Sequence, residues 1–374
     1  MASASANEER VTRAFLELVR IDSPTFQEQA ICRRLTADLE ALGLTVENDG
    51  TGRDGVGNLI ARLDGGAGLP IALSAHFDTV QPGEGIEPII EGGIVRSAGD
   101  TILGADDKAG IVAILEALQV LREAGLPHPP LEIVLTWGEE RAHLGAAAVD
   151  VSKLRSKVCF VPDAEGEIGT IIAAAPSYES IHAEFHGVGA HAGMKPEDGR
   201  SAILAAARAI ARTPLGRLDE ETTCNVGLIG GGSVRNAVPA RATVDAEARS
   251  LDDAKLDRVL SDLREHWESA AAEVGCTVEI STKREYRAYR LTNDDFRMTL
   301  ARDGAALAGV PFRAISTGGG SDANTLSERG LPSACLSAAM WKPHTRDEHV
   351  ATADLRLLSD YLLGIIAAAG KVTP

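Results

Sequence analysis

The chain of 374 residues is predicted to be an α/β protein that carries a smaller inserted α+β unit. Its length exceeds one ordinary core and fits two domains. Short apolar runs alternate with helical patterns near both ends of the chain, which is typical of a largely parallel sheet flanked by helices. Between these regions the pattern changes to longer alternating strands. The α/β domain is expected to comprise residues 1–177 and 289–374, and the insertion residues 178–288.

The N-terminal region is expected to begin with two helices. Apolar residues recur at helical spacing from Glu8 to Val19. The stretch from Thr25 to Glu28 matches a capping box, which predicts a second helix that stops at Gly43. The strand and helix segments that follow are NLIARL, PIALSAHFD, DKAGIVAILEALQVLREAG, LEIVLTW and KVCFVPD.

The insertion is expected to form a compact unit of about a hundred residues, which is a normal domain size. Its predicted strands are SIHAEFHG, TCNVGLIGG, ATVDAEARS and TVEISTKREY, and its predicted helices are RSAILAAARAIA and LDDAKLDRVLSDLREHWESAAAEVG. After Asn293 the segments DFRMTLARDGAALAG and PSACLSAAM resume the first pattern.

Composition restricts the classes of partner. A formal net charge of −17 would repel phosphate backbones and anionic lipid, so neither nucleic acid nor a membrane is expected as a partner. The five cysteines are scattered and odd in number, which favours a reducing cytoplasm over a disulfide framework. The N-terminus lacks the pattern of a secretory signal. The apolar run YLLGIIAAAG is shorter than the about 18 residues of a membrane span.

Titratable side chains follow several of the predicted strands, at the sheet edge where ligands bind in doubly wound folds. Taken singly, each has an ordinary structural explanation. A histidine here is often structural, an aspartate often caps a helix, and Lys108 is expected to be an ordinary first-turn residue. The residues at the predicted strand ends and helix start are His76, Asp78, Asp106, Asp107, Glu139, Glu140, Asp163 and His344.

Taken together, these side chains predict a metal site. Two imidazoles and several carboxylates match the mixed ligands of Zn²⁺, or of Mn²⁺ and Co²⁺ in the same geometry. The carboxylates exceed the need of one ion, and they would not all stay ionised in a partly buried cleft without cations between them. A pair of ions about 3.5–4 Å apart, bridged by a carboxylate, uses such a set.

The motifs also resemble a known family. They occur in the order and at the separations seen in the dinuclear zinc exopeptidases typified by peptidase T (family M-twenty), and they cover nearly the whole chain. That resemblance implies a three-layer α/β/α catalytic domain with an inserted α+β lid and dimerisation domain. The motifs are SAHFDTV, LGADDKAG, GEE, VPDAEG, GVGAHAG, GGSVRNAVPA, AEARS, GGGSDAN and HTRDEHV.

The resemblance implies a role for each strand-end residue. Asp106 would bridge two metal ions, and its peptide bond to Asp107 would be cis. Glu139 would be the general base, turned by strand alternation to the face opposite Glu140. Asp78 would orient the first histidine ligand. The remaining ligands would be His76 and Asp163 for one ion, and Glu140 and His344 for the other.

The inserted unit resembles the family's lid. His191 matches a histidine that polarises the scissile carbonyl, often from the partner subunit of a homodimer. Asn236 and Arg249 match residues that hold the substrate's carboxylate or backbone, which suits the planar fork of arginine. Gly319 and Gly320 lie in a loop that would let the backbone approach the substrate, although a flexible turn explains these glycines as well.

These parallels imply hydrolysis of amide bonds in short peptides by two bound ions. An aspartate at position 163 tends to accompany aminopeptidases and dipeptidases, which favours removal of the N-terminal residue from tripeptides. The alternatives are a carboxypeptidase, an N-acyl amino acid amidohydrolase, or a non-catalytic scaffold on the same fold. Arg141 and His143 depart from the family's small or aliphatic residues and glycine after GEE, and both are expected near the cleft mouth.

Overall fold

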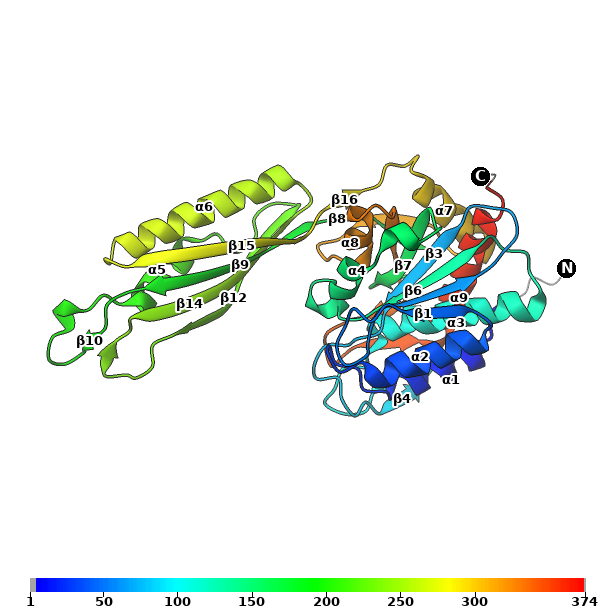
Figure 1. Cartoon of the computed structure of the whole chain (residues 1–374), viewed down its shortest axis with the longest axis horizontal. Helices are drawn as coiled ribbons and strands as arrows, with labels where there is room; N and C mark the ends of the chain where they lie inside the picture. Colours follow the sequence, from blue (N-terminus) through cyan, green and yellow to red (C-terminus); the bar gives the residue numbers. More distant parts are fainter. Residues whose placement is uncertain (1–4, 373–374) are drawn as a thin grey trace. The chain divides into compact units, whose positions relative to one another are not determined.

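The computed structural model describes residues 5–372, which form two compact units (Figure 1). Unit 1 contains the chain up to Ala173, then Arg290–Ser316, and the chain from Ser321 onward. Unit 2 contains Ala174–Tyr289 and Thr317–Gly320. Each unit has its own sheet and its own helices, and each is described by itself.

Unit 1 is built on a nine-stranded sheet whose main path runs β1-β2-β6-β3-β7-β18-β8-β16, with β17 beside β8. The pairs among β6, β3, β7 and β18 are parallel, whereas the pairs β1-β2, β2-β6 and β18-β8 are antiparallel. The sheet is therefore less parallel than expected. Its strands are β1 (Thr45–Asn48), β2 (Leu59–Leu63), β3 (Ile71–His76), β6 (Leu131–Thr136), β7 (Val158–Ala164), β8 (Thr170–Ala175), β16 (Tyr289–Arg290), β17 (Arg313–Ser316) and β18 (Ser333–Ser337).

Helices cover the sheet of unit 1. α1, α3, α7 and α9 pack against one another, and α3 lies on β3 and β7, while α8 lies on β7 and β18 with α4 beside it (Figure 1). The central strands β3 and β6 are buried along their whole length, as expected for strands covered on both faces. The helices are α1 (Glu8–Val19), α2 (Gln29–Ala41), α3 (Ala105–Ala124), α4 (Leu144–Ala148), α7 (Phe296–Ala308), α8 (Asp322–Glu328) and α9 (Thr352–Ala369).

A second, four-stranded sheet in unit 1 was not predicted. Its order is β19-β20-β5-β4, and its pairs are antiparallel. It brings the chain just after His344 beside a hairpin that precedes α3. The strands are β4 (Pro88–Glu91), β5 (Ile94–Ser97), β19 (Met340–Trp341) and β20 (His349–Ala351).

The start of α2 differs from the prediction, whereas α1 has the predicted bounds of Glu8 and Val19. α2 begins at Gln29, and the side chain of its N-cap residue Glu28 makes no capping hydrogen bond. Phe26 has a φ of 74°, so the backbone cannot be helical from Thr25 onward. The hydroxyl of Thr25 instead donates to Asp78 Oδ2 at 2.7 Å, and the predicted capping box is wrong.

Unit 2 is an antiparallel sheet of order β11-β12-β14-β9-β15, with α5 and α6 packed on one face. Burial alternates residue by residue along β9 and β14, because successive side chains point to opposite faces. A two-stranded ribbon of β10 and β13 lies beyond the end of this sheet where β9 ends and β14 begins (Figure 1). The elements are β9 (Ser177–His186), β10 (Ala190–His191), α5 (Ala202–Arg212), β11 (Gly216–Arg217), β12 (Thr222–Gly231), β13 (Ala237–Val238), β14 (Arg241–Ser250), α6 (Asp253–Ala272) and β15 (Thr277–Tyr286).

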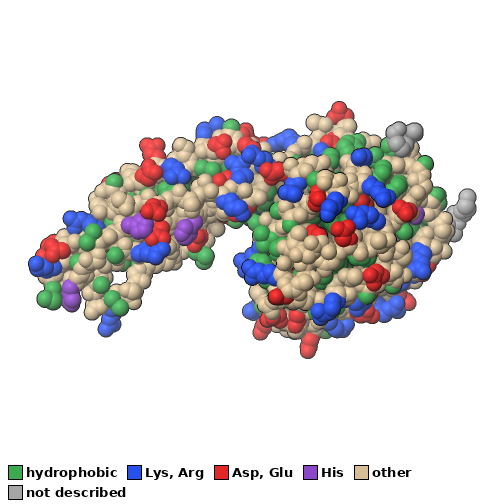
Figure 2. All heavy atoms as spheres, viewed as in Figure 1, with side chains coloured by type: hydrophobic (Ala, Val, Ile, Leu, Met, Phe, Trp, Pro, Cys, Tyr) green, Lys and Arg blue, Asp and Glu red, His purple; other side chains and the backbone are tan. Residues whose placement is uncertain are grey.

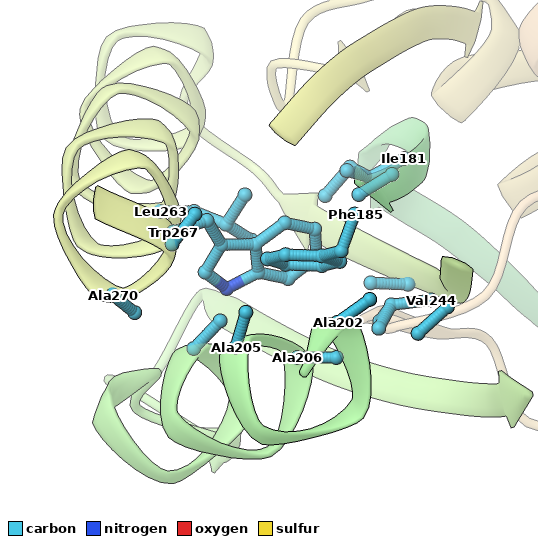
Figure 3. Packing of buried hydrophobic residues seen from close by; sticks show 14 of the residues in the cluster. Ile181, Phe185, Ala202, Ala205, Ala206, Val244, Leu263, Trp267 and Ala270 are labelled. Atoms are coloured by element: carbon cyan, nitrogen blue, oxygen red, sulfur yellow. The ribbon is translucent and has the colours of Figure 1, made fainter. Parts of the chain in front are cut away.

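The core of unit 2 combines two large aromatic rings with many alanines (Figure 3). Trp267 of α6 is fully buried, and its ring centroid lies 6.1 Å from that of Phe185 on β9. Its indole N–H donates to Thr213 Oγ1 at 2.8 Å, so the one polar atom of the ring is satisfied. Alanines on α5, including Ala202 and Ala205, let that helix approach the rings closely.

The surface is charged with both signs. On the face drawn in Figure 2, acidic and basic side chains are interspersed over both units. No helix within residues 5–372 is long and apolar enough to cross a membrane.

Candidate active site

The site residues of unit 1 meet because their strands run in parallel. β3 pairs with β6 so that His76 lies opposite Thr136, and β7 runs parallel on the other side of β3. The carboxyl ends of the three strands therefore lie at one edge of the sheet. Residues that follow them in the chain are brought together there.

Asp106 lies between two histidines at this edge. Its Oδ1 is 3.0 Å from His76 Nε2, and its Oδ2 is 3.2 Å from His344 Nε2. The peptide bond between Asp106 and Asp107 is cis, as the resemblance implied. Each oxygen of one carboxylate thus faces a different imidazole.

The other two carboxylates complete this arrangement. Glu140 Oε1 lies 2.9 Å from His344 Nε2, and Asp163 Oδ1 lies 3.5 Å from His76 Nε2. Ligand atoms of His76, Asp106 and Glu140 all lie within 4.8 Å of one another, which makes them a possible metal-binding group. The five residues predicted as ligands are therefore linked by contacts, in the pairing that the resemblance implied.

The electrostatics of the group suit a cation. Burial raises the pKa of Asp163 well above its usual range, because a buried carboxylate is poorly solvated. Hydrogen bonds to Asp106 and Glu140 raise the pKa of His344 to about 11, which reflects the negative potential around it. Two imidazoles and three carboxylates are also a ligand set that divalent zinc accepts. The residue types and the negative potential of this group therefore suit the binding of divalent metal ions.

Asp78 is hydrogen-bonded to the site residues and lies outside the possible metal-binding group of His76, Asp106 and Glu140. It is fully buried, and its Oδ1 accepts from the backbone N–H of Glu139 at 2.9 Å. His76 Nδ1 is 3.0 Å from the carbonyl oxygen of Asp78. Since a carbonyl oxygen only accepts, Nδ1 carries a ring proton, and this hydrogen bond orients Nε2 toward the carboxylates of Asp106 and Asp163. The hydroxyl of Thr25 holds Asp78 from the far side, which no local sequence pattern predicted.

Glu139 and Glu140 point in different directions because they lie in a turn, and not because they alternate along a strand. β6 ends at Thr136, and Glu139–Arg141 form a 3₁₀ turn after Gly138, whose φ is 61°. The prediction that strand alternation turns Glu139 and Glu140 to opposite faces is therefore wrong. Glu140 contacts His344, whereas Glu139 is buried and Oε1 of its carboxylate lies 3.2 Å from His143 Nε2.

Comparison with known proteins identifies the family. Residues 177–275 match the family model "Peptidase dimerisation domain", and residues 58–165 match "Peptidase family M28". An uncharacterized Bacillus subtilis protein, YqjE, is 39% identical over 369 residues, which are 98% of this chain and all of that relative. The crystal structure of aminopeptidase PepT from Bacillus cereus is 38% identical, with a TM-score of 0.87 over 98% of this chain and 100% of that one. A tripeptidase from Staphylococcus aureus is 35% identical, with a TM-score of 0.92 over the same shares.

The chain belongs to the peptidase T-like branch of the M-twenty peptidase family. The mixed α/β fold with an inserted dimerisation-type domain is confirmed. As a member of this branch, the chain is a metal-dependent peptidase.

Two residues of this peptidase-type site were missed or misjudged from the sequence. Glu348 is buried, and its carboxylate accepts from the backbone N–H groups of Leu103, Gly104 and Asp106 at 2.8, 2.8 and 3.0 Å. It lies within HTRDEHV, so the motif covered it but not its role. Lys108 is fully buried rather than an ordinary first-turn residue, because the carbonyl of Ile21 accepts from its Nζ at 2.8 Å.

His191 and Asn236 lie together in unit 2. Both are exposed, and β10 pairs with β13 so that Ala192 N donates to Asn236 O at 3.0 Å. The backbone N–H groups of Gly193 and Met194 donate to His191 Nδ1 at 3.2 and 3.1 Å. The ring proton of neutral His191 is therefore on Nε2, which leaves that atom free to act as a donor.

Arg249 lies at the other end of unit 2, near the start of β9. Its guanidinium stacks over Tyr178 with 4.6 Å to the ring centroid and pairs with Glu247 at 3.1 Å. His191 lies beyond the opposite end of β14, which spans Arg241–Ser250 or about 30 Å at 3.3 Å per residue. Within one chain, His191 and Arg249 cannot hold the same small group.

The two loop glycines differ in their surroundings. A Cβ at Gly320 would meet the ring of Tyr286 at 2.3 Å, so close packing requires glycine there. At Gly319 a Cβ would meet only Thr317 Oγ1, at 3.7 Å. Packing therefore explains Gly320 and leaves Gly319 without a structural requirement.

Arg141 and His143, which follow the GEE motif, differ in their exposure to solvent. Arg141 is exposed, but His143 is 4% exposed and does not lie at a cleft mouth as predicted. The reason is that Ala142 and His143 both have left-handed backbone, with φ of 62° and 57°, which turns the chain back toward the interior.

Proposed function

We propose that this peptidase removes the N-terminal residue from tripeptides and other short peptides, with two bound zinc ions. The observation that supports two ions is the position of Asp106, whose two oxygens face two different histidines. His76 and Asp163 would hold one ion, Glu140 and His344 the other, and Asp106 both. When bound, the ions supply Lewis-acid chemistry, polarising a carbonyl and lowering the pKa of water.

The chain's own residues move the proton in this proposal. Glu139 takes the proton of the attacking water and returns it to the leaving amine. Burial raises the pKa of Glu139 well above its usual range, which suits a carboxylate that must hold a proton briefly. The Nε2–H of His191 donates to the carbonyl oxygen of the substrate, where negative charge develops. Asp78 keeps the backbone of Glu139 in place.

Substrate tests separate this proposal from its rivals. We expect hydrolysis of an alanyl tripeptide with added Zn²⁺, Mn²⁺ or Co²⁺, and little hydrolysis of its N-acetylated form or of an N-acyl amino acid. Equal cleavage of the N-blocked tripeptide would reject aminopeptidase action. Inactivity with every metal and every amide would reject hydrolysis altogether.

The base role has its own test. Glu139→Gln keeps the shape of the side chain but removes proton acceptance, so kcat should fall by about a thousandfold or more. Metal content, measured by mass spectrometry, should stay at the wild-type level. Substantial turnover by this variant would remove Glu139 from the base role.

The active protein is proposed to be a homodimer formed through unit 2. β11 pairs with β12 only at Thr223 and Cys224, so within the described residues the edge of β12 from Asn225 to Gly231 faces no further strand of the sheet. Leu228 and Ile229 on this edge are 67% and 56% exposed. An unpaired apolar edge is a ready surface for a second copy. In such a dimer, His191 of one chain would complete the site that contains Arg249 of the other.

Mixing two inactive variants tests the shared site. His191→Ala and Arg249→Ala chains should each be nearly inactive alone. Random pairing makes about half of the dimers mixed, each with one intact site, so about a quarter of the wild-type rate should return. Sedimentation should also show monomers for Leu228→Asp. No recovery on mixing, or a wild-type monomer with full activity, would reject the shared site.

A further inference from the structure

A buried histidine next to the proposed base has no role in the proposed function. His143 lies outside the ligand group of His76, Asp106 and Glu140. Its Nε2 is 3.2 Å from Glu139 Oε1, and both residues are less than a tenth exposed. A buried imidazole in contact with a buried carboxylate restricts the orientation of both groups.

The backbone is folded to make this contact. After the 3₁₀ turn Glu139–Arg141, Ala142 and His143 both adopt left-handed backbone. The N–H of His143 then donates to the carbonyl of Glu139 at 2.8 Å. Two successive residues with a Cβ in this region are uncommon, so the surrounding contacts must hold them there. Glu139 is thus held by His143 through both its backbone and its side chain.

The ring of His143 is fixed from its other side. Its Nδ1 lies 2.9 Å from the hydroxyl of Thr325, in the middle of α8. That helix begins with a capping box at Ser321, which secures its first turn. When the hydroxyl of Thr325 donates to Nδ1, the ring proton lies on Nε2, which is the nitrogen 3.2 Å from Glu139 Oε1. The ring therefore connects the proposed base to a capped helix.

We propose that His143 is a positioning residue for Glu139. Its Nε2–H occupies Oε1 of the carboxylate, which fixes the rotamer of Glu139 and leaves Oε2 as the oxygen that takes up the proton. This inference rests on the proposed function, because it gives His143 importance only if Glu139 is the base. Its chemistry is hydrogen bonding alone, and His143 itself touches no substrate.

A purely structural role is the competing explanation, and two conservative variants separate the two. In His143→Gln, the side-chain amide nitrogen reaches the place of Nε2 and can still donate to Glu139. In His143→Asn, the shorter amide reaches only the place of Nδ1 and can still bond Thr325. Asparagine tolerates left-handed backbone better than glutamine, so fold stability should favour His143→Asn.

The test compares kcat, KM, metal content and thermal stability of the two variants with an alanyl tripeptide. Positioning predicts that kcat falls about ten- to hundredfold in His143→Asn and much less in His143→Gln, with KM and metal content nearly unchanged. Activity and stability would then rank the variants in opposite orders. If kcat instead follows stability, if the loss appears in KM, or if His143→Asn has wild-type kcat, the inference fails.

Glu139→Gln, measured in parallel, keeps failure of the inference apart from failure of the proposed function. An active Glu139→Gln would reject the base role and the inference with it. An inactive Glu139→Gln together with a fully active His143→Asn would reject the inference alone. Combining Glu139→Gln with His143→Asn should cost little more than Glu139→Gln, since both changes disable one group. A further large loss in the double variant would overturn the inference.

Discussion

The two units bury different kinds of side chain. At the carboxyl edge of its sheet, unit 1 buries charged groups that contact one another, among them His76, Asp106 and Glu139. The core of unit 2 is apolar, with Trp267 and Phe185 among alanines, and its functional candidates His191 and Asn236 are exposed. Buried charges are costly unless they are paired or bind metal. In the proposed function, unit 1 therefore carries the metal chemistry and must pair its charges in its interior, whereas unit 2 presents its candidate groups at the surface.

Metal removal should have the largest effect, and it should act on unit 1. Chelation is expected to abolish peptide hydrolysis, and added zinc should restore it. A metal present at a thousandfold excess over its Kd stabilises the folded state by about 4 kcal/mol, which chelation removes. Hydrogen exchange should rise in β3 and β6 but not in α5 or α6. Equal loss of protection in both units would contradict the expectation that the metal stabilises unit 1 in particular.

Trp267→Ala should destabilise unit 2 and leave unit 1 unaffected, which is the opposite of metal removal. Removing a fully buried indole costs about 3–5 kcal/mol, and the loss should appear as faster hydrogen exchange within residues 177–275. Metal content should remain at the wild-type level. Trp267→Phe is the control, because it keeps a ring beside Phe185 and loses the hydrogen bond to Thr213. An unchanged unfolding midpoint in Trp267→Ala would contradict the packing argument.

Glu348→Gln tests whether unit 1 needs both carboxylate oxygens of Glu348 as hydrogen-bond acceptors. One oxygen of Glu348 accepts two backbone N–H groups and the other accepts one, so an amide NH₂ must face a donor. We expect a loss of about 2 kcal/mol in stability. Zinc affinity should fall about tenfold, because the segment that carries Asp106 loosens.

Asp347→Asn is the matched control for Glu348→Gln. It makes the same change of charge one residue away, at an exposed side chain that pairs with Lys342. Exposed ion pairs contribute about 0–1 kcal/mol, so this variant should resemble wild type. Similar losses in both variants would show that charge, rather than the buried acceptor geometry, matters here.

Arg141→Ala should have the smallest effect. Arg141 is exposed, although in the sequence it lies between the proposed base Glu139 and its proposed positioning residue His143. Its replacement should leave stability within about 0.5 kcal/mol of wild type, as measured by denaturant unfolding. A loss above 1 kcal/mol would mean that position in the chain, and not burial, decides which residues of unit 1 are important.

Local sequence patterns predicted the existence of helices and strands better than they predicted where these elements end or which distant residues their side chains contact. The apolar spacing of Val11, Phe15 and Leu18 predicted α1 correctly, since a helix face depends on residues three and four apart. The Thr25 hydroxyl was misassigned because its actual partner, Asp78, is 53 residues away. A capping box depends only on residues close in the sequence. Here the Thr25 hydroxyl instead donates to the buried carboxylate of Asp78, which would be costly to leave without a donor.

The sequence alone determined the residue types of the candidate ligands, their order along the chain, and through them the family. Those features depend on residue type and spacing, which the sequence states directly. The tertiary structure alone decided that His344 and Glu140, 204 residues apart, are in contact, and that His143 faces inward to Glu139. Such contacts depend on parallel strand ends, a left-handed turn and a capped helix meeting at one place. No short stretch of chain contains that information, because packing between distant segments sets it.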